Sequence, residues 1–350
     1  MKKRFQITLT AIFSVVVFCV GTMLVYAETL VSGNQFDGEG APLALDGSQY
    51  IVVENVTASD DETLTTHGYT DLSTILESEE PERIATGFQF TEGPVWHPDG
   101  YLLFSDIPAN AILKWTPDGK VETFRKPSGN SNGLTFDHQG RFIACEHGNR
   151  RVSRTEKDGT VVTLADRYSG KRLNSPNDLA VRSDGSIYFT DPPYGVQEEQ
   201  RELDFQGVYR LASDGTLTLL IDDFDRPNGL AFSPDEKILY IADSNRKHVR
   251  AFDVKADGTL ENDRVFAELK SDEPGVPDGM KVDTKGNLYV TGPGGTWVFN
   301  PTGKHLGIIV TPELPANCAF GGKDNKTLFI TARTSVYRVK VKISGIKVFQ

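Results

Sequence analysis

The stretch Asn228–Asp243 reads NGLAFSPDEKILYIAD. It contains a polar first residue, a strand of alternating apolar side chains, a tight turn at Pro234-Asp235, and a second apolar strand over 238–241. Five other stretches repeat this pattern, and their first residues are Glu92, Asn132, Asn177, Asp278 and Asn317. The six starts lie 40, 45, 51, 50 and 39 residues apart along the chain. This period is typical of four-stranded propeller blades and predicts an all-β fold, a six-bladed β-propeller.

The rest of each repeat supports two further strands. In the repeat that begins at Asn228, residues 248–254 alternate again, Asp257-Gly258 is a hairpin signal, and 263–269 supply the fourth strand. No segment has the pattern of a long amphipathic helix. The ring is therefore predicted to span residues 83–350. We expect the early strand 84–90 to pair with the last blade and close the ring, which leaves only short sheet edges.

The N-terminus has the pattern of a secretory signal peptide over residues 1–27. Lys2, Lys3 and Arg4 form a basic region, an apolar run follows to Val25, and Ala27 stands at the expected cleavage point. The apolar run approaches spanning length, so an uncleaved membrane anchor is the alternative. Cleavage predicts an exported protein, periplasmic or extracellular, with no stable membrane insertion.

Residues 28–82 are rich in Gly, Ser, Thr, Asp and Glu, and we interpret them as a short extension or linker. The chain carries a formal net charge of -11, which disfavours nucleic acid as a partner. Cys145 and Cys318 remain after signal cleavage, either as one disulfide or as two buried thiols.

The first residues of the six repeats predict a metal site. Equivalent positions in a closed ring are related by rotation, so if one of these side chains faces the central channel, all six do. The set holds two carboxylates (Glu92, Asp278) and four carboxamides (Asn132, Asn177, Asn228, Asn317). Converging oxygen ligands suit a hard cation, Ca²⁺ above all. The alternative is that Asx residues cap a turn, which explains Glu92 poorly.

The sequence resembles the family of gluconolactonases, senescence marker protein and luciferin-regenerating enzyme. The resemblance covers roughly residues 83–345 and rests on ordered motifs: EGPVWHPDG, SNGLTFD, CEHGNRRV, SPNDLAV, TDPPYG, RPNGLAFSPDEK, VPDGMKVD and CAFGGKD. It implies a six-bladed propeller that hydrolyses lactones with a divalent cation in its channel. Diisopropylfluorophosphatases share this architecture.

The resemblance also implies roles for individual residues. Glu92, Asn177, Asn228 and Asp278 correspond to metal ligands, and Asn132 lies where the family contacts substrate hydroxyls. An arginine often found two residues before Asn132 is replaced by Asn130, which affects the choice of lactone. Mg²⁺, Mn²⁺ or Zn²⁺ are candidates to substitute for Ca²⁺ in an assay.

Lactone cleavage passes through a tetrahedral oxyanion, and a bound cation is suited to stabilise it. Asp278 is the candidate catalytic residue, as general base or as nucleophile. Glu146 and His147 end a strand pair near the channel mouth, so they either bind the substrate or form a structural strand-end pair. The second strands of three repeats end in an aspartate at the same phase: Asp106, Asp191 and Asp243. This recurrence predicts structural hydrogen bonds to neighbouring loops, and the alternative for Asp191, in TDPPYG, is that it lines the channel mouth.

We therefore expect a metal-dependent lactonase whose substrate is a small-molecule lactone. Two other functions use the same residues differently. A phosphotriesterase-like hydrolase would use the same metal ring on phosphoesters. A non-enzymatic propeller would keep the metal as a structural pin and bind a partner on its face.

Overall fold

The computed structural model describes residues 13–18, 24–29, 72–77 and 80–348 of the chain. The chain divides into two units, residues 1–64 and 65–350. In the first unit, β1 (Phe13–Phe18) and β2 (Leu24–Thr29) form an antiparallel pair. Most of the predicted signal peptide and extension lies outside the described residues, so both stay predictions. No helix in the described part of the chain is long and apolar enough to cross a membrane.

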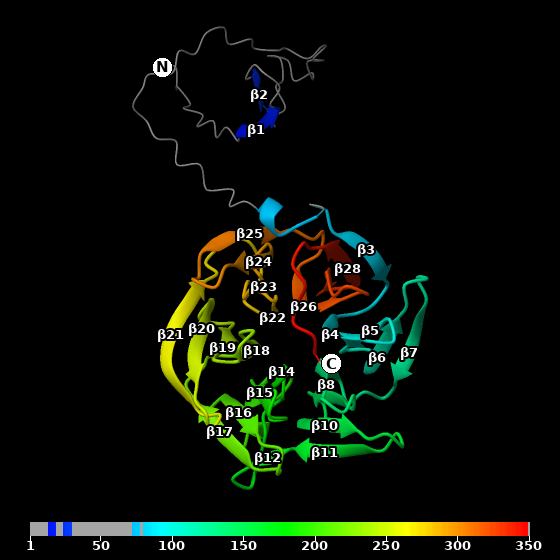
Figure 1. Cartoon of the computed structure of the whole chain (residues 1–350), viewed down its shortest axis with the longest axis vertical. Helices are drawn as coiled ribbons and strands as arrows, with labels where there is room; N and C mark the ends of the chain where they lie inside the picture. Colours follow the sequence, from blue (N-terminus) through cyan, green and yellow to red (C-terminus); the bar gives the residue numbers. More distant parts are fainter. Residues whose placement is uncertain (1–12, 19–23, 30–71, 78–79, 349–350) are drawn as a thin grey trace, which may run out of the picture. The chain divides into compact units, whose positions relative to one another are not determined.

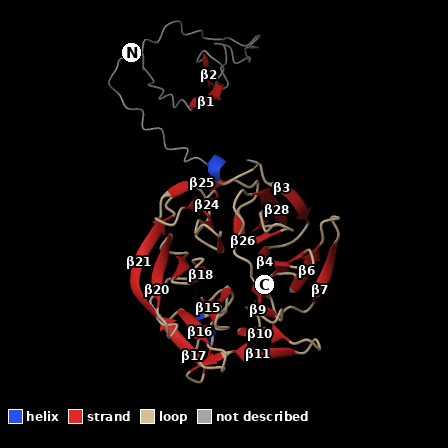
Figure 2. Ribbon diagram, viewed as in Figure 1, coloured by secondary structure: helices blue, strands red, loops and turns tan. Residues whose placement is uncertain are grey.

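The second unit is a six-bladed β-propeller, as the repeat predicts, and it is built almost entirely of strands (Figure 1, Figure 2). Each blade is a four-stranded antiparallel sheet. In blades 1 to 5, the innermost strand is the first of the four along the sequence. The strands of blades 1 to 3 are β4 (Thr91–His97), β5 (Tyr101–Asp106), β6 (Ala111–Trp115), β7 (Val121–Arg125), β8 (Ser131–Phe136), β9 (Phe142–Glu146), β10 (Arg151–Thr155), β11 (Val161–Ala165), β14 (Leu179–Val181), β15 (Ile187–Asp191), β16 (Gly207–Leu211) and β17 (Leu217–Ile221).

Blades 4 to 6 continue the ring. Their strands are β18 (Pro227–Phe232), β19 (Ile238–Asp243), β20 (His248–Val254), β21 (Leu260–Glu268), β22 (Met280–Val282), β23 (Leu288–Gly292), β24 (Gly295–Phe299), β25 (His305–Ile309), β26 (Pro315–Gly321), β27 (Thr327–Ala332), β28 (Ser335–Lys340) and β3 (Glu82–Thr86). A short pair, β12 (Arg167–Tyr168) with β13 (Lys171–Arg172), and two single-turn 3₁₀ helices, η1 (Leu72–Thr74) and η2 (Glu198–Gln200), complete the described elements.

The ring closes by pairing an early strand with the last blade. β3 runs antiparallel to β28, with Thr86 opposite Ser335. Arg338 adds two hydrogen bonds to Glu82, at 2.8 and 3.0 Å. The predicted closure is confirmed, although the paired strand is Glu82–Thr86 rather than 84–90. Closure gives the last blade its fourth strand, so all six blades of the ring are four-stranded sheets with short edges.

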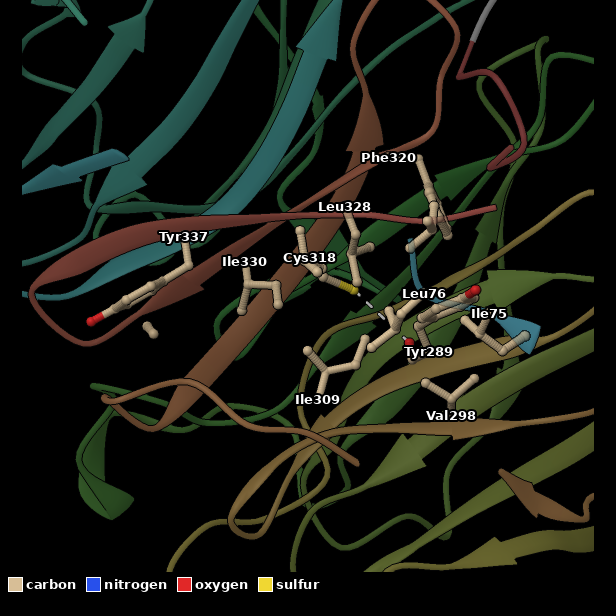
Figure 3. Packing of buried hydrophobic residues seen from close by; sticks show 13 residues of the cluster. Ile75, Leu76, Tyr289, Val298, Ile309, Cys318, Phe320, Leu328, Ile330 and Tyr337 are labelled. Atoms are coloured by element: carbon tan, nitrogen blue, oxygen red, sulfur yellow. Dashed lines mark hydrogen bonds between the residues drawn. The ribbon is translucent and has the colours of Figure 1, made fainter. Parts of the chain in front are cut away.

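The hydrophobic core lies between blades, in clusters that combine residues of two neighbouring sheets. Large aromatic side chains fill these interfaces, and each contributes on the order of 1.5–3 kcal/mol on burial. One such cluster joins blades 5 and 6 and includes Tyr289 and Phe320 (Figure 3). Ile75 and Leu76 belong to the same cluster, so part of the predicted extension 28–82 packs into the core.

The apolar end of the channel contrasts with the end that carries the repeat starts. A cavity of about 120 Å³ at this end is lined by apolar residues of all six inner strands. Ile346 and Val348, which follow β28, also line it, and the red segment after β28 runs inside the ring (Figure 1). Gly345 packs so closely on Phe320 that a Cβ would lie 2.0 Å from its ring. The polar end is therefore the end suited to chemistry.

Candidate active site

The six residues that begin the repeats, here called the lead residues, lie at one end of the inner strands. Four are in strands β4, β8, β18 and β26, and the other two lie two residues before the starts of β14 and β22. Five of them are buried: Glu92, Asn132, Asn177, Asn228 and Asn317. The sixth, Asp278, is partly buried. The lead residues therefore lie at or near the start of the inner strand in all six blades.

Glycines after the lead residues allow neighbouring blades to approach. Gly93 has a φ of +49°, and a Cβ at that position would lie 1.9 Å from the carbonyl oxygen of Asn132 in the next blade. A Cβ on Gly229 would lie 2.4 Å from the carbonyl oxygen of Asp278. A larger residue would push the blades apart. The repeated Gly thus brings the lead residues close together.

Aspartates at the ends of second strands hold the loops that enter the inner strands. Asp191 accepts hydrogen bonds from the backbone N–H groups of Asn174 and Ser175, both at 2.7 Å. Asp106 and Asp243 accept backbone N–H groups of residues 89, 90 and 225 in the same way. The structural role that the sequence predicted for these aspartates is confirmed, and it positions the lead residues that follow.

Three carboxylates at this end of the ring, Glu92, Asp278 and Asp178, act on one another, with smaller opposing contributions from the cations Lys281 and Arg333. Burial raises the pKa of Glu92 to about 7, and the charge of Asp178 adds to that rise. Burial also raises the pKa of Asp278 well above its ordinary value, with further contributions from Glu92 and Asp178. Each of these charges therefore disfavours the others, and a cation bound among them would stabilise all three.

Side-chain oxygens in this group lack hydrogen-bond partners. Within the described residues, the Oδ1 atoms of Asn132, Asn228 and Asp278 are buried and unpaired. Buried polar atoms are normally satisfied, so each of these requires an explanation. In residues 72–77 and 80–348, no three His, Cys, Asp or Glu side chains converge closely enough to hold a metal by themselves. A cation at this site would therefore need the amide oxygens as well.

Tyr194 and His147 stand beside the lead residues. Asn228 donates through Nδ2 to Tyr194 Oη (3.4 Å) and to Ser244 Oγ (3.2 Å). Asn132 Nδ2 lies 3.4 Å from His147 Nε2. Burial lowers the pKa of His147 to about 4, so its imidazole is neutral at physiological pH. The structure thus brings His147 to the predicted substrate residue Asn132.

Glu146 points into a different environment from its neighbour. It accepts hydrogen bonds from Arg125 (2.8 Å), Arg151 (2.7 Å), Asn149 (2.5 Å) and Ser153 (2.5 Å). Burial acts to raise its pKa, but these hydrogen bonds and the Arg125 charge lower it overall. The cluster borders a cavity of about 330 Å³ between blades 1 and 2. These contacts favour the structural interpretation of Glu146, and substrate contact stays a prediction.

Sequence reasoning missed Asp178, Tyr194 and Ser244. Asp178 occupies a position at which four of the other repeats have Gly. This difference from the repeat pattern is the feature of the sequence that marks Asp178. Tyr194 belongs to the quoted TDPPYG motif, but its contact with Asn228 depends on the path of a loop. Cys145 and Cys318 are both buried and free, in different blades, which resolves their alternatives in favour of thiols.

Comparisons with known proteins agree with the geometry. Residues 90–334 match the SMP-30/Gluconolactonase/LRE-like region. The chain is 39% identical to a gluconolactonase of Zymomonas mobilis over 78% of this chain and 85% of that protein. The solved structure of a gluconolactonase from Xanthomonas campestris is 38% identical, covers 77% of this chain and 92% of its own, and superposes with a TM-score of 0.71. A calcium-binding regucalcin from Agrobacterium tumefaciens shares the fold at 18% identity, with a TM-score of 0.64 over 78% of this chain and 95% of its own.

Proposed function

The chain belongs to the SMP-30/gluconolactonase/LRE-like family, and on that premise we propose that it is a lactonase that opens sugar-type lactones. We further propose that it depends on a divalent cation, Ca²⁺ by preference, held by Glu92, Asn177, Asn228 and Asp278. The signal-like N-terminus supports export to the periplasm or the extracellular space.

The observation that carries the proposal is the group of unpaired oxygens among buried carboxylates. The Oδ1 atoms of Asn228 and Asp278 lack partners, and Glu92 lies in the same group, since its charge raises the pKa of Asp278. All donors are oxygen atoms, and Ca²⁺ accepts six to eight such ligands in flexible geometry. The residues present therefore fit the cation.

The chain's own residues supply the proton chemistry. A bound divalent cation would polarise the lactone carbonyl and stabilise the oxyanion that forms there. Asp278 Oδ1 has no hydrogen-bond partner among the described residues, so it is placed to accept a proton from water. Burial raises its pKa in the cation-free protein, whereas a bound cation would favour the ionised form, which is the form that accepts the proton. Asn132 would contribute hydrogen bonds to substrate hydroxyl groups.

Acid release from glucono-1,5-lactone tests this proposal. The purified protein is assayed as prepared, after EDTA treatment, and after Ca²⁺ is restored. We expect EDTA to abolish activity, Ca²⁺ to restore it, and Asp278→Asn to reduce kcat by about 10²- to 10⁴-fold. Asp99→Asn is the matched control, because that carboxylate is 78% exposed in a turn.

Two results would overturn the proposal. Activity of Asp278→Asn equal to that of the wild type, in folded protein, would remove Asp278 from the reaction. Hydrolysis of phosphotriesters with no hydrolysis of any lactone in a panel of γ- and δ-lactones would replace the substrate class.

A further inference from the structure

Tyr194 reaches the lead residues from a loop that is held at both ends of its turn. The loop follows β15, where Asp191 accepts the backbone N–H groups of residues 174 and 175. Val196 N–H then donates to Pro193 O (3.2 Å), which closes a four-residue turn. Gly195 has a φ of +72° in that turn, a conformation that favours glycine. Tyr194 is therefore held in a defined position beside Asn228.

The hydrogen bonds around Asn228 decide which end of its amide faces Tyr194 and Ser244. Ser244 donates its hydroxyl proton to the carbonyl oxygen of Pro277 (2.7 Å). Because Ser244 donates its only hydroxyl proton to Pro277, its Oγ atom can only accept a hydrogen bond from Asn228. The part of the Asn228 amide that faces Ser244 is therefore the NH₂ group. Tyr194 Oη lies 3.4 Å from the same Nδ2 atom. The amide oxygen of Asn228 is consequently turned away from both hydroxyl groups, and it is buried and unpaired among the described residues.

We infer that Tyr194 and Ser244 are positioning residues that hold the carboxamide of Asn228 with its oxygen available to a divalent cation. The inference rests on the proposed function, because it concerns the same cation. Groups that orient a metal ligand typically change metal affinity by about 10- to 100-fold when they are removed. The hydrogen bond from Ser244 to Pro277 O also links Asn228, through Ser244, to the backbone next to Asp278. Asp278 is the lead residue of the following blade.

The Tyr194 ring has packing contacts that must be separated from its hydroxyl. Arg226 lies over the ring at 5.3 Å from its centroid, and the His147 ring lies 6.4 Å away. Tyr194→Phe keeps the ring and both contacts and removes only Oη. A role in loop packing alone would therefore survive this substitution.

Calorimetric titration of Ca²⁺ into the EDTA-treated protein, after removal of the chelator, measures the effect without relying on catalysis. We expect Tyr194→Phe and Ser244→Ala each to weaken Ca²⁺ binding by about tenfold or more. Tyr188→Phe is the matched control, because Tyr188 Oη donates to Gly258 O (2.7 Å) away from the lead residues. This control should leave Ca²⁺ affinity unchanged. Circular dichroism and urea unfolding establish that each variant is folded.

A double-mutant cycle makes the test specific to amide orientation. An aspartate at position 228 presents an oxygen whichever way its carboxylate turns. In the Asn228→Asp background, Tyr194→Phe should therefore change Ca²⁺ affinity by less than about twofold, and the coupling between the two substitutions should be large.

The outcomes separate this inference from the proposed function. Tight Ca²⁺ binding by the wild type with unchanged affinity in Tyr194→Phe and Ser244→Ala overturns the positioning role and leaves the lactonase intact. Weakened binding in both variants of a protein that opens no lactone supports the positioning role and overturns the lactonase. If Tyr194→Phe weakens Ca²⁺ binding equally in the wild-type and Asn228→Asp backgrounds, the hydroxyl group does not act by orienting the amide. That result overturns the inference.

Discussion

Removal of the charge on Glu92 should change how the stability of the cation-free protein depends on pH. Burial raises the pKa of this carboxyl from 4.5 to about 7 in the folded chain. The folded state therefore holds a proton that the unfolded chain releases at lower pH. The stabilisation from this group is fully present below about pH 4.5 and is lost as the pH rises through about 7.

The size of the effect follows from the shift. At 1.36 kcal/mol for each pKa unit, a rise from 4.5 to about 7 corresponds to about 3 kcal/mol of unfolding free energy. Asp278 and Asp191 also have raised pKa values, so they add pH dependence of the same sign to any protein that retains them. The informative quantity is therefore the difference in unfolding free energy between the wild type and Glu92→Gln, because the glutamine side chain stays neutral at every pH.

Urea unfolding in EDTA at a series of pH values from 4.5 to 8 measures this difference. As the pH rises across that range, we expect the unfolding free energy of the wild type to fall by about 3 kcal/mol more than that of Glu92→Gln. Excess Ca²⁺ should remove most of the difference, because a bound cation favours the ionised carboxylate. Parallel stability curves for the two proteins in EDTA would refute the reasoning, since they would show that Glu92 is not a desolvated carboxyl.

Other substitutions test the surrounding structure. Glu146→Ala should lower the unfolding free energy by about 3 kcal/mol, because it removes the carboxylate that pairs with two arginines. The kcat of this variant should change only a few-fold. Lost activity at unchanged stability would instead indicate that Glu146 contacts the substrate. An NMR titration of His147 should show an inflection near 4, since burial lowers its pKa to about 4, and an inflection near 6.5 would contradict that burial. Gly93→Ala should destabilise the protein by about 1–3 kcal/mol more than Gly100→Ala. Both glycines have positive φ, but only a Cβ at Gly93 meets backbone, 1.9 Å from Asn132 O.

Much of the candidate site could be predicted because the repeat carries it. Glu92, Asn228 and Asp278 occupy one phase of a periodic pattern, and a closed ring places that phase at one end of the channel. The aspartates at second-strand ends were predictable for the same reason. Glu146 and His147 show the limit. Glu146 ends β9 and His147 follows it in the turn, yet Glu146 contacts Arg125 and Arg151, whereas His147 contacts Asn132.

The sequence by itself determined the number of blades, the position of each inner strand and the identity of the lead residues, because hydrophobic period and turn chemistry are local properties that recur in every repeat. Only the tertiary structure decided which oxygens are left without partners. Whether Asn228 presents its oxygen depends on Ser244, Pro277 and Tyr194, which come from three different loops. Such contacts join residues far apart in the chain, and no local pattern records them, because hydrogen bonding between loops depends on where the closed ring places each one.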